Sequence, residues 1–227
     1  MKYEVILFDA DDTLFDFKKS ENNAFKNTMI QFDISYDEDY HLKVYKEINK
    51  ALWNDFEKGN ITQEKLKIER FKRLSDKIGI KFDSHEFAAA YVKNLANESH
   101  LYEESTTLVE ELHKNYKLVM VTNGLTDVQD KRIRKSSLAK YFEHIVISEE
   151  VKASKPDAKI FEVALNYIQH FDKSKVIMIG DSLTSDIRGG LNFGVDTCWF
   201  NPSNTKNQSD IKPTYEITSL VDIRKIL

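Results

Sequence analysis

Short apolar runs rich in Val, Ile and Met recur along the chain, and each has the length of a strand buried on both faces. They are Tyr3–Phe8, Lys117–Val121, His144–Ile147, Val176–Ile179 and Asp196–Phe200. From residue 105 onward, these runs alternate with stretches in which apolar residues recur at helical spacing. Those stretches are Thr106–Asn115, Asp127–Lys135, Asp157–Gln169 and Ser185–Phe193. The alternation predicts βαβ units, and therefore an α/β fold whose mostly parallel sheet is covered by helices on both faces.

Residues 16–98 follow a different pattern, which predicts helices and contains no convincing strand. Their apolar residues recur three and four positions apart. Gly59 and Gly79 follow two of these stretches, at positions where helices often end in a left-handed residue. We therefore expect two domains, a core made of residues 1–15 and 99–227 and an all-helical insertion made of residues 16–98.

The charge balance and the single cysteine exclude several classes of protein. The 227 residues include 33 Lys and Arg against 37 Asp and Glu, which gives a formal net charge of −4. A chain this close to neutral lacks the generally basic surface of nucleic-acid-binding proteins. Cys198 has no partner for an internal disulfide, which fits a reducing compartment. No run approaches the roughly 18 apolar residues of a membrane span, so we expect a cytoplasmic protein without a membrane partner.

Acidic residues directly follow two of the predicted strands. Asp9 and Asp11 come after the first strand, and Asp181 and Asp186 come after Val176–Ile179. Residues i and i+2 of an extended chain point the same way, so Asp9 and Asp11 can face a common site beyond the carboxyl end of the strand. Two like charges about 4 Å apart repel by roughly 4 kcal/mol at an effective dielectric constant of 20, so such a cluster needs a cation. All the candidate ligand atoms are oxygens, which favours Mg²⁺ over zinc.

Two other strand ends carry groups that suit an anion. Thr122, Asn123 and Gly124 follow the second predicted strand and offer a hydroxyl, an amide and backbone N–H groups. Lys155 precedes a proline at the predicted start of a helix, and the proline restricts the local chain. Lys152 is a rival lysine, but no proline follows it. Together with the acids, these residues predict a site for an anionic substrate and a metal ion.

These groups, in this order, resemble the four motifs of the haloacid-dehalogenase-like phosphohydrolases, and the resemblance covers essentially the whole chain. The matching segments are Asp9-Ala10-Asp11-Asp12-Thr13, Thr122-Asn123-Gly124, Lys155-Pro156 and Gly180-Asp181 with Asp186. One departure is Asp12, which stands where the family usually has glycine. The resemblance implies a Rossmann-like three-layer core, and it implies that residues 16–98 form a helical cap of the C1 type.

The resemblance also implies a mechanism for phosphate-ester hydrolysis. Asp9 would attack phosphorus in line and form an aspartyl-phosphate, while Asp11 would protonate the leaving alcohol and then activate water. Mg²⁺ would be bound by Asp9, by the backbone carbonyl of Asp11 and by Asp181, and Asp186 would lie one layer further from the ion. The phosphoryl oxygens would be bound by the residues of the second and third motifs, Thr122, Asn123, Gly124 and Lys155.

Two shorter segments, residues 8–15 and 51–59, resemble one branch of this family, the YjjG/YfnB-type 5′-nucleotidases. That branch hydrolyses nucleoside monophosphates with a preference for pyrimidine and non-canonical bases, so the resemblance implies a small phosphorylated substrate of this kind. Phe17, Trp53 and Phe56 could stack on a base, with about 1–3 kcal/mol per base. Each of the three, taken alone, is more simply a core residue of the helical domain.

Other functions explain less of the sequence. A sugar-phosphate phosphatase or phosphomutase would share the four motifs and differ in the cap, and it is the main alternative. A 2-haloacid dehalogenase would have no use for Asp11, because a halide leaves without a proton. A catalytically silent phosphate-binding module would not need the complete set of residues. The block Gly180-Asp181-Ser182-Leu183 is typical of some serine esterases, but no histidine follows His170 to act as the base.

The remaining polar and sulfur-containing features are expected to be structural. The basic stretch Lys131–Lys135 predicts a solvated helix face. Cys198 lies in an apolar run, which predicts a buried and inert thiol.

Overall fold

The computed structural model describes residues 2–227 and confirms the α/β fold, with one six-stranded sheet. The strands are β1 (Val5–Phe8), β2 (Lys117–Thr122), β3 (His144–Ile147), β4 (Val176–Gly180), β5 (Asp196–Phe200) and β6 (Tyr215–Ile217). Their order across the sheet is β3-β2-β1-β4-β5-β6, and every pairing is parallel. β6 was not predicted from the sequence, because this short edge strand has only one buried residue, Ile217.

The helices lie between the strands as predicted, but several of their ends differ from the prediction. They are α1 (Phe17–Gln31), α2 (Lys43–Glu57), α3 (Gln63–Ile78), α4 (Ser84–Ala96), α5 (Glu103–Leu112), α6 (Thr126–Arg132), α7 (Ser148–Val151), α8 (Ala158–Tyr167) and α9 (Arg188–Phe193). The helix predicted at Ser185–Phe193 is divided into a π-helical turn, Leu183–Ile187, and α9. No helix among residues 2–227 is both long enough and apolar enough to cross a membrane.

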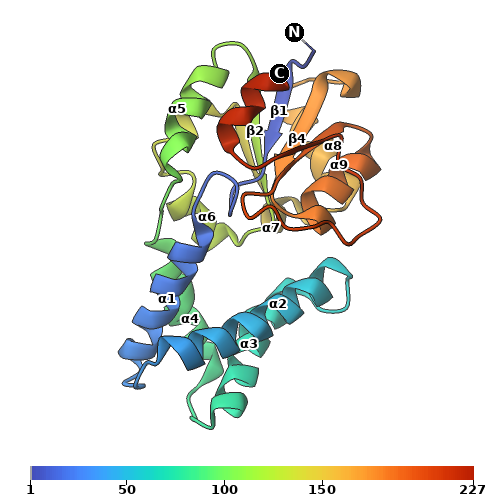
Figure 1. Ribbon diagram of the computed structural model, residues 1–227. Coiled ribbons are helices and arrows are strands. Elements are labelled where there is room, and N and C mark those ends of the chain that lie inside the picture. Colours follow the sequence, from blue (N-terminus) through green and yellow to red (C-terminus); the bar gives the residue numbers. More distant parts are fainter. Residues whose placement is uncertain (1) are drawn as a thin grey trace. The chain divides into compact units, whose positions relative to one another are not determined.

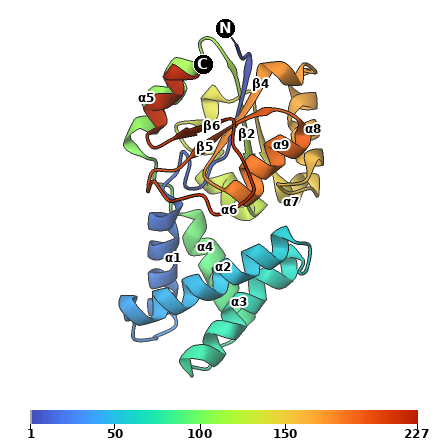
Figure 2. The ribbon, with the colours of Figure 1, turned by 45° about the vertical axis from the view of Figure 1, so that its right-hand side comes forward.

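Both faces of the sheet are buried, which explains the continuous apolar runs of its strands. Side chains alternate along β1, so that Val5 and Leu7 belong to one apolar cluster and Ile6 and Phe8 to the other. The first cluster includes residues of α8 and α9, and the second includes residues of α5 and of the 3₁₀-helix Leu220–Lys225. Figure 2 shows these helices on opposite sides of the sheet, which is the three-layer arrangement expected.

The chain forms two compact units. One holds the chain up to Phe17 together with Ser99–Leu227 and contains the sheet; the other, Lys18–Glu98, is entirely helical (Figure 1). The helical unit has its own aromatic core, in which the rings of Phe25 and Tyr45 stack with their centroids 4.5 Å apart. Each unit therefore buries apolar side chains of its own, which is the property that defines a domain.

Candidate active site

The site lies at the carboxyl ends of β1 and β4, which are neighbours at the centre of the sheet. Phe8 at the end of β1 is paired with Ile179 of β4, and the Asp9 N–H donates to the Ile179 carbonyl at 2.9 Å. In the strand order β3-β2-β1-β4-β5-β6, β1 and β4 stand at the point where the direction of winding reverses. Open α/β sheets bind their ligands at this point, so the fold itself places Asp9 and Asp181 where a ligand is expected.

Three carboxylates converge at this point and form a site suited to a divalent metal ion. Asp9, Asp181 and Asp186 each have an oxygen within 4.8 Å of the other two. Thr13 Oγ1 donates to Asp9 Oδ2 at 3.1 Å, and the Ser182 N–H donates to Asp186 Oδ2 at 2.9 Å. These bonds leave other carboxylate lone pairs for an ion. A donor set made only of oxygens suits a hard cation, so the residues present fit the magnesium site that the sequence predicts.

Gly180 makes room for Asp186 in this cluster. A Cβ atom at Gly180 would lie 2.3 Å from Asp186 Oδ2, which is closer than a carbon and an oxygen atom that are not covalently bonded can approach. Any other residue at this position would displace the carboxylate. The fourth motif therefore has glycine at this position because the Asp186 side chain lies close to the backbone. The backbone of Gly180 does not have a positive φ.

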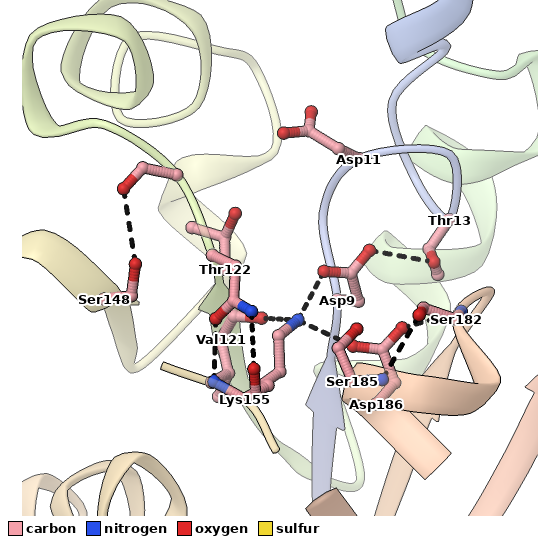
Figure 3. Close-up of polar contacts among 12 residues, drawn as sticks. Asp9, Asp11, Thr13, Val121, Thr122, Ser148, Lys155, Ser182, Ser185 and Asp186 are labelled. Atoms are coloured by element: carbon pink, nitrogen blue, oxygen red, sulfur yellow. Dashed lines mark hydrogen bonds and ion pairs between the residues drawn. The ribbon is translucent and has the colours of Figure 1, made fainter. Parts of the chain in front are cut away.

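Lys155 supplies a buried positive charge to the same cluster. Its Nζ lies 2.5 Å from Asp9 Oδ1, 2.7 Å from Asp186 Oδ1 and 2.6 Å from the Val121 carbonyl, and 1% of its side chain is exposed. Figure 3 shows the ammonium between these three partners. The rival Lys152 is exposed and belongs to the C-terminal end of α7. The structure therefore brings Lys155, and not Lys152, to the acids.

Burial dominates the electrostatics of these groups, because an ionised side chain is stabilised poorly away from water. Burial raises the pKa of Asp9 to about 7, although Lys155 opposes the effect. Burial, with the charges of Asp9 and Asp186, also raises the pKa of Asp181 well above its usual range. Burial by itself would lower the pKa of Lys155, but Asp186 and Asp9 together raise it above its ordinary value. Three carboxyl groups share one ammonium at this point, so their ionised forms lack positive charge, which a bound cation would supply.

The end of β2 is linked to Lys155 through Asn123, the residue that follows this strand. Thr122 is 2% exposed at the end of β2. The Asn123 side chain makes two hydrogen bonds to the backbone of Lys155: Nδ2 donates to its carbonyl and Oδ1 accepts from its N–H, both at 2.8 Å. The side chain of Asn123 therefore holds the lysine in position, a role that the sequence analysis did not foresee.

Asp11 is bound by residues of α6. β1 ends at Phe8, so the two-residue alternation of a strand does not extend to Asp11. Its Oδ1 accepts from Arg132 at 2.8 Å and its Oδ2 accepts from Gln129 at 2.8 Å. In Figure 3 its carboxylate lies apart from the cluster formed by Asp9, Lys155 and Asp186.

The prediction of a solvated helix face at Lys131–Lys135 is wrong for Arg132, whose side chain is fully buried. Lys131, Arg134 and Lys135 do reach the surface, at least in part. The sequence did contain one sign of this burial, the apolar Ile133. Ile133 is also fully buried, and it lies on the same side of the helical segment as Gln129, four residues earlier. An apolar residue within a basic stretch indicates that one face is buried.

The three aromatic residues proposed for the base lie in both units. Phe17 is half-buried at the end of the first segment of the α/β unit, where the Arg132 guanidinium lies 5.1 Å from the centre of its ring. Trp53 and Phe56 are half-buried on α2 of the helical unit, with ring centroids 5.6 Å apart and their planes nearly perpendicular. None of the three belongs to the buried core.

Comparison with known proteins agrees with this geometry. The family model described as haloacid dehalogenase-like hydrolase matches residues 6–200. The chain is 38% identical to the pyrimidine 5′-nucleotidase PynA of Streptococcus pneumoniae, over 98% of this chain and 94% of that protein. It is 32% identical to the pyrimidine 5′-nucleotidase YjjG of Escherichia coli, over 100% of this chain and 99% of that protein.

Solved structures show the same likeness. A crystal structure of the HAD-hydrolase YfnB of Bacillus subtilis, bound to magnesium, superposes with a TM-score of 0.94 at 35% identity, and the match covers 100% of this chain and 99% of that one. A 2-haloacid dehalogenase from Pseudomonas syringae, at 21% identity and a TM-score of 0.68, shares the fold. The family model, the full-length relatives and the convergence of the four motifs at one site agree, and this chain belongs to the haloacid dehalogenase-like hydrolases.

Proposed function

We propose that this protein is a phosphomonoesterase that hydrolyses pyrimidine nucleoside 5′-monophosphates through an aspartyl-phosphate. The observation that carries the proposal is the buried ion pair of Asp9 with Lys155, which lies within a three-carboxylate cluster and bonds the Val121 carbonyl, one residue before Thr122. This set offers a nucleophile, a positive charge and a cation site in one place. The substrate class is supported by the full-length similarity to two proteins named pyrimidine 5′-nucleotidases.

In the proposed reaction, a carboxylate oxygen of Asp9 attacks phosphorus in line and the bond to the nucleoside 5′-oxygen breaks. Asp11 gives its proton to that oxygen, and it later takes a proton from the water that cleaves the aspartyl-phosphate. Lys155 and the Thr122 hydroxyl hold the transferred phosphoryl oxygens, with the Asn123 and Gly124 N–H groups as further donors. Charge stabilisation of this kind supplies most of the rate enhancement in phosphoryl transfer.

We propose Mg²⁺ as the metal. Asp9 and Asp181 would hold it with the backbone carbonyl of Asp11, and Asp186 would support this set while it also pairs with Lys155. When bound, Mg²⁺ supplies positive charge to the phosphoryl oxygens and to the carboxylate cluster. The oxygen-only donor set and the magnesium-bound relative YfnB both support this choice.

We propose that the helical unit acts as the cap that selects the leaving group, and that Phe17, Trp53 and Phe56 contact the base. Partial exposure of all three rings supports this, since a ring that is fully packed in a core cannot stack on a ligand. Trp53→Ala is expected to raise the KM for uridine 5′-monophosphate about fivefold or more, because one stacked base is worth about 1–3 kcal/mol. The KM for p-nitrophenyl phosphate should change little. Equal losses with both substrates would show a packing role.

The experiment that tests the proposed function is a phosphate-release assay with and without Mg²⁺. The substrates are nucleoside 5′-monophosphates, hexose phosphates and triose phosphates, and chloride release from a 2-haloacid is measured in parallel. We expect Mg²⁺-dependent release, fastest from pyrimidine nucleotides, and loss of activity in Asp9→Asn. A preference for sugar phosphates would reject the substrate class and keep the mechanism. Chloride release without Mg²⁺, or full activity in Asp9→Asn, would reject the mechanism.

A further inference from the structure

We propose that Gln129 and Arg132 of α6 are positioning residues, which set the orientations of the Asp11 carboxyl group and the Thr122 hydroxyl. This inference rests on the proposed function, because it concerns the step in which Asp11 protonates the leaving oxygen. Its basis is a hydrogen-bonded chain that runs from Asp11 to Thr122. Gln129 Nε2 donates to Asp11 Oδ2 at 2.8 Å and to Thr122 Oγ1 at 3.1 Å, and Arg132 donates to Asp11 Oδ1 at 2.8 Å.

The side chains of the two donors, Gln129 and Arg132, are also bonded to each other on α6. Three residues apart, they lie on the same side of the helix, and Arg132 also donates to Gln129 Oε1 at 3.0 Å. This bond fixes the Gln129 amide, since its oxygen must face the guanidinium and its NH₂ group must face Asp11 and Thr122. The exposed fraction is 1% for Gln129 and 0% for Arg132, so water does not compete with these bonds.

Neighbouring residues support the pair of Gln129 and Arg132, although they make none of the hydrogen bonds that link Asp11 to Thr122. A Cβ atom on Gly124 would lie 2.4 Å from Gln129 Cγ, so the glycine of the second motif is the residue that lets Gln129 reach Thr122. The Arg132 guanidinium also lies over the rings of Phe17, at 5.1 Å, and Phe15, at 6.0 Å. Aromatic faces attract a cation whatever the charge of its carboxylate partner. Arg132 is therefore also held by contacts other than its pair with Asp11.

The arrangement leaves Asp11 free to exchange a proton while its orientation is fixed. A carboxylate has about four acceptor positions on its two oxygens, and α6 occupies one on each oxygen. The remaining positions can carry the proton that goes to the leaving group. Its side chain is 24% exposed, so these positions are not enclosed by the protein. Without the two donors the carboxyl group would rotate freely and present its proton in many directions.

Gln129 also determines what the Thr122 hydroxyl can do. An amide NH₂ group can only donate, so Thr122 Oγ1 is the acceptor in this bond. The hydrogen of the hydroxyl is then free to donate to a phosphoryl oxygen, which is the role proposed for Thr122. One glutamine thus orients both the residue that protonates the leaving group and a residue that holds the phosphoryl group.

The test uses two esters that differ in their need for an acid. The alcohol released from uridine 5′-monophosphate requires a proton, whereas p-nitrophenolate leaves as a stable anion. kcat/KM is measured for both with Mg²⁺ present, because this constant includes only the steps up to release of the leaving group. General acid catalysis is worth about 10²–10⁴-fold and a misplaced group costs up to about 10²-fold, so Arg132→Met should lower kcat/KM for the nucleotide by about tenfold to hundredfold. The value for p-nitrophenyl phosphate should fall by less than about threefold on the same reasoning.

Asp11→Asn provides the reference pattern. It should show the same dependence on the leaving group. In the Asp11→Asn background, Arg132→Met should cause a further loss of less than about threefold, because Arg132 acts mainly through Asp11 and reaches Thr122 only through Gln129. The matched control is Arg134→Met. Arg134 lies two residues after Arg132 and pairs with Asp130 and Glu150 at the surface, so this variant should leave kcat/KM unchanged for both esters. Near-ultraviolet circular dichroism checks that each variant is folded.

Gln129→Met also tests whether α6 positions Asp11 and Thr122, and it removes no charge. If Arg132→Met does not fold, Gln129→Met tests the inference by itself. It should lower kcat/KM for both esters, since Thr122 serves both, and lower it further for the nucleotide. Equal losses with both esters in Arg132→Met and Gln129→Met, or additive losses with Asp11→Asn, would overturn the inference. A wild-type protein that hydrolyses neither ester would instead refute the proposed function.

Discussion

Replacement of Lys155 by methionine would test the charge balance of the site in the metal-free protein. The Lys155 ammonium lies 2.5 Å from Asp9 and 2.7 Å from Asp186, and its side chain is 1% exposed. Methionine is similar in length and can pack in the same space. The substitution therefore removes a cation from two buried carboxylates, together with the hydrogen bond that the ammonium donates to the Val121 carbonyl.

The expected loss of stability follows from these distances. At an effective dielectric constant of 20, unit charges roughly 2.6 Å apart attract by about 6 kcal/mol, and Lys155 makes two such pairs. Desolvation of the ammonium offsets several kcal/mol of this attraction, and loss of one partner of a buried pair costs about 3–5 kcal/mol. We therefore expect Lys155→Met to lower the free energy of unfolding by about 3–5 kcal/mol at pH 8. The loss should be smaller at pH 5, because burial raises the pKa of Asp9 to about 7 and the carboxyl group is protonated below that value.

The assay is urea unfolding with a metal chelator present, followed by tryptophan fluorescence. Trp199 lies in the α/β unit, where its indole N–H donates to the Asp181 carbonyl at 2.8 Å, and a Trp53→Phe background leaves it as the reporter. Lys152→Met is the matched control, and at this exposed position it should change stability by no more than about 0.5 kcal/mol. A loss below about 1 kcal/mol at pH 8 would show that this buried cation contributes no more to stability than a surface one, contrary to the charge balance described above.

Three further predictions concern the α/β unit. Gly180→Ala should weaken Mg²⁺ binding, measured by titration calorimetry, about tenfold or more, because the new methyl group displaces Asp186; unchanged binding would contradict this. Burial raises the pKa of Asp9 from 3.8 to about 7, so the stability from its bound proton is complete below pH 3.8 and lost as the pH rises through about 7. Mg²⁺ needs the ionised carboxylates of Asp9 and Asp181, so it should raise Tm more at pH 8 than at pH 5.5, and equal shifts would count against this account. Burial raises the pKa of the Cys198 thiol to about 12, so a disulfide reagent at pH 8 should modify it only after unfolding, and fast modification of the native protein would show that the thiol is accessible.

The sequence was most informative where one local pattern had one structural meaning. The runs His144–Ile147 and Asp196–Phe200 are strands with the predicted bounds, because an apolar run of four or five residues between polar segments has few other uses. Helix ends were predicted less well: α5 begins at Glu103, three residues before the predicted start. Helix ends depend on capping contacts and on the connecting chain, which hydrophobic periodicity does not contain.

The partners of Asp11 were not predictable from any local pattern. Arg132 lies 121 residues further along the chain, and the pair forms only when α6 packs beside the loop that follows β1. A basic stretch looks the same whether its arginine is solvated or buried, since the free energy of burial depends on a carboxylate supplied by another segment. The same reason explains why the roles of Gln129 and of the Asn123 side chain were missed.

From the sequence alone it followed that strands and helices alternate, that a helical segment comes after the first strand, and that four chemically suited motifs come after successive strands. These are properties of short segments, and periodicity and residue type are sufficient to define them. The position of β1 between β2 and β4, which brings Asp9, Lys155 and Asp186 into contact, is a property of the packed chain that no short segment contains. Strand order and side-chain pairing minimise the free energy of the whole packed chain, and residues distant in sequence contribute to that free energy together.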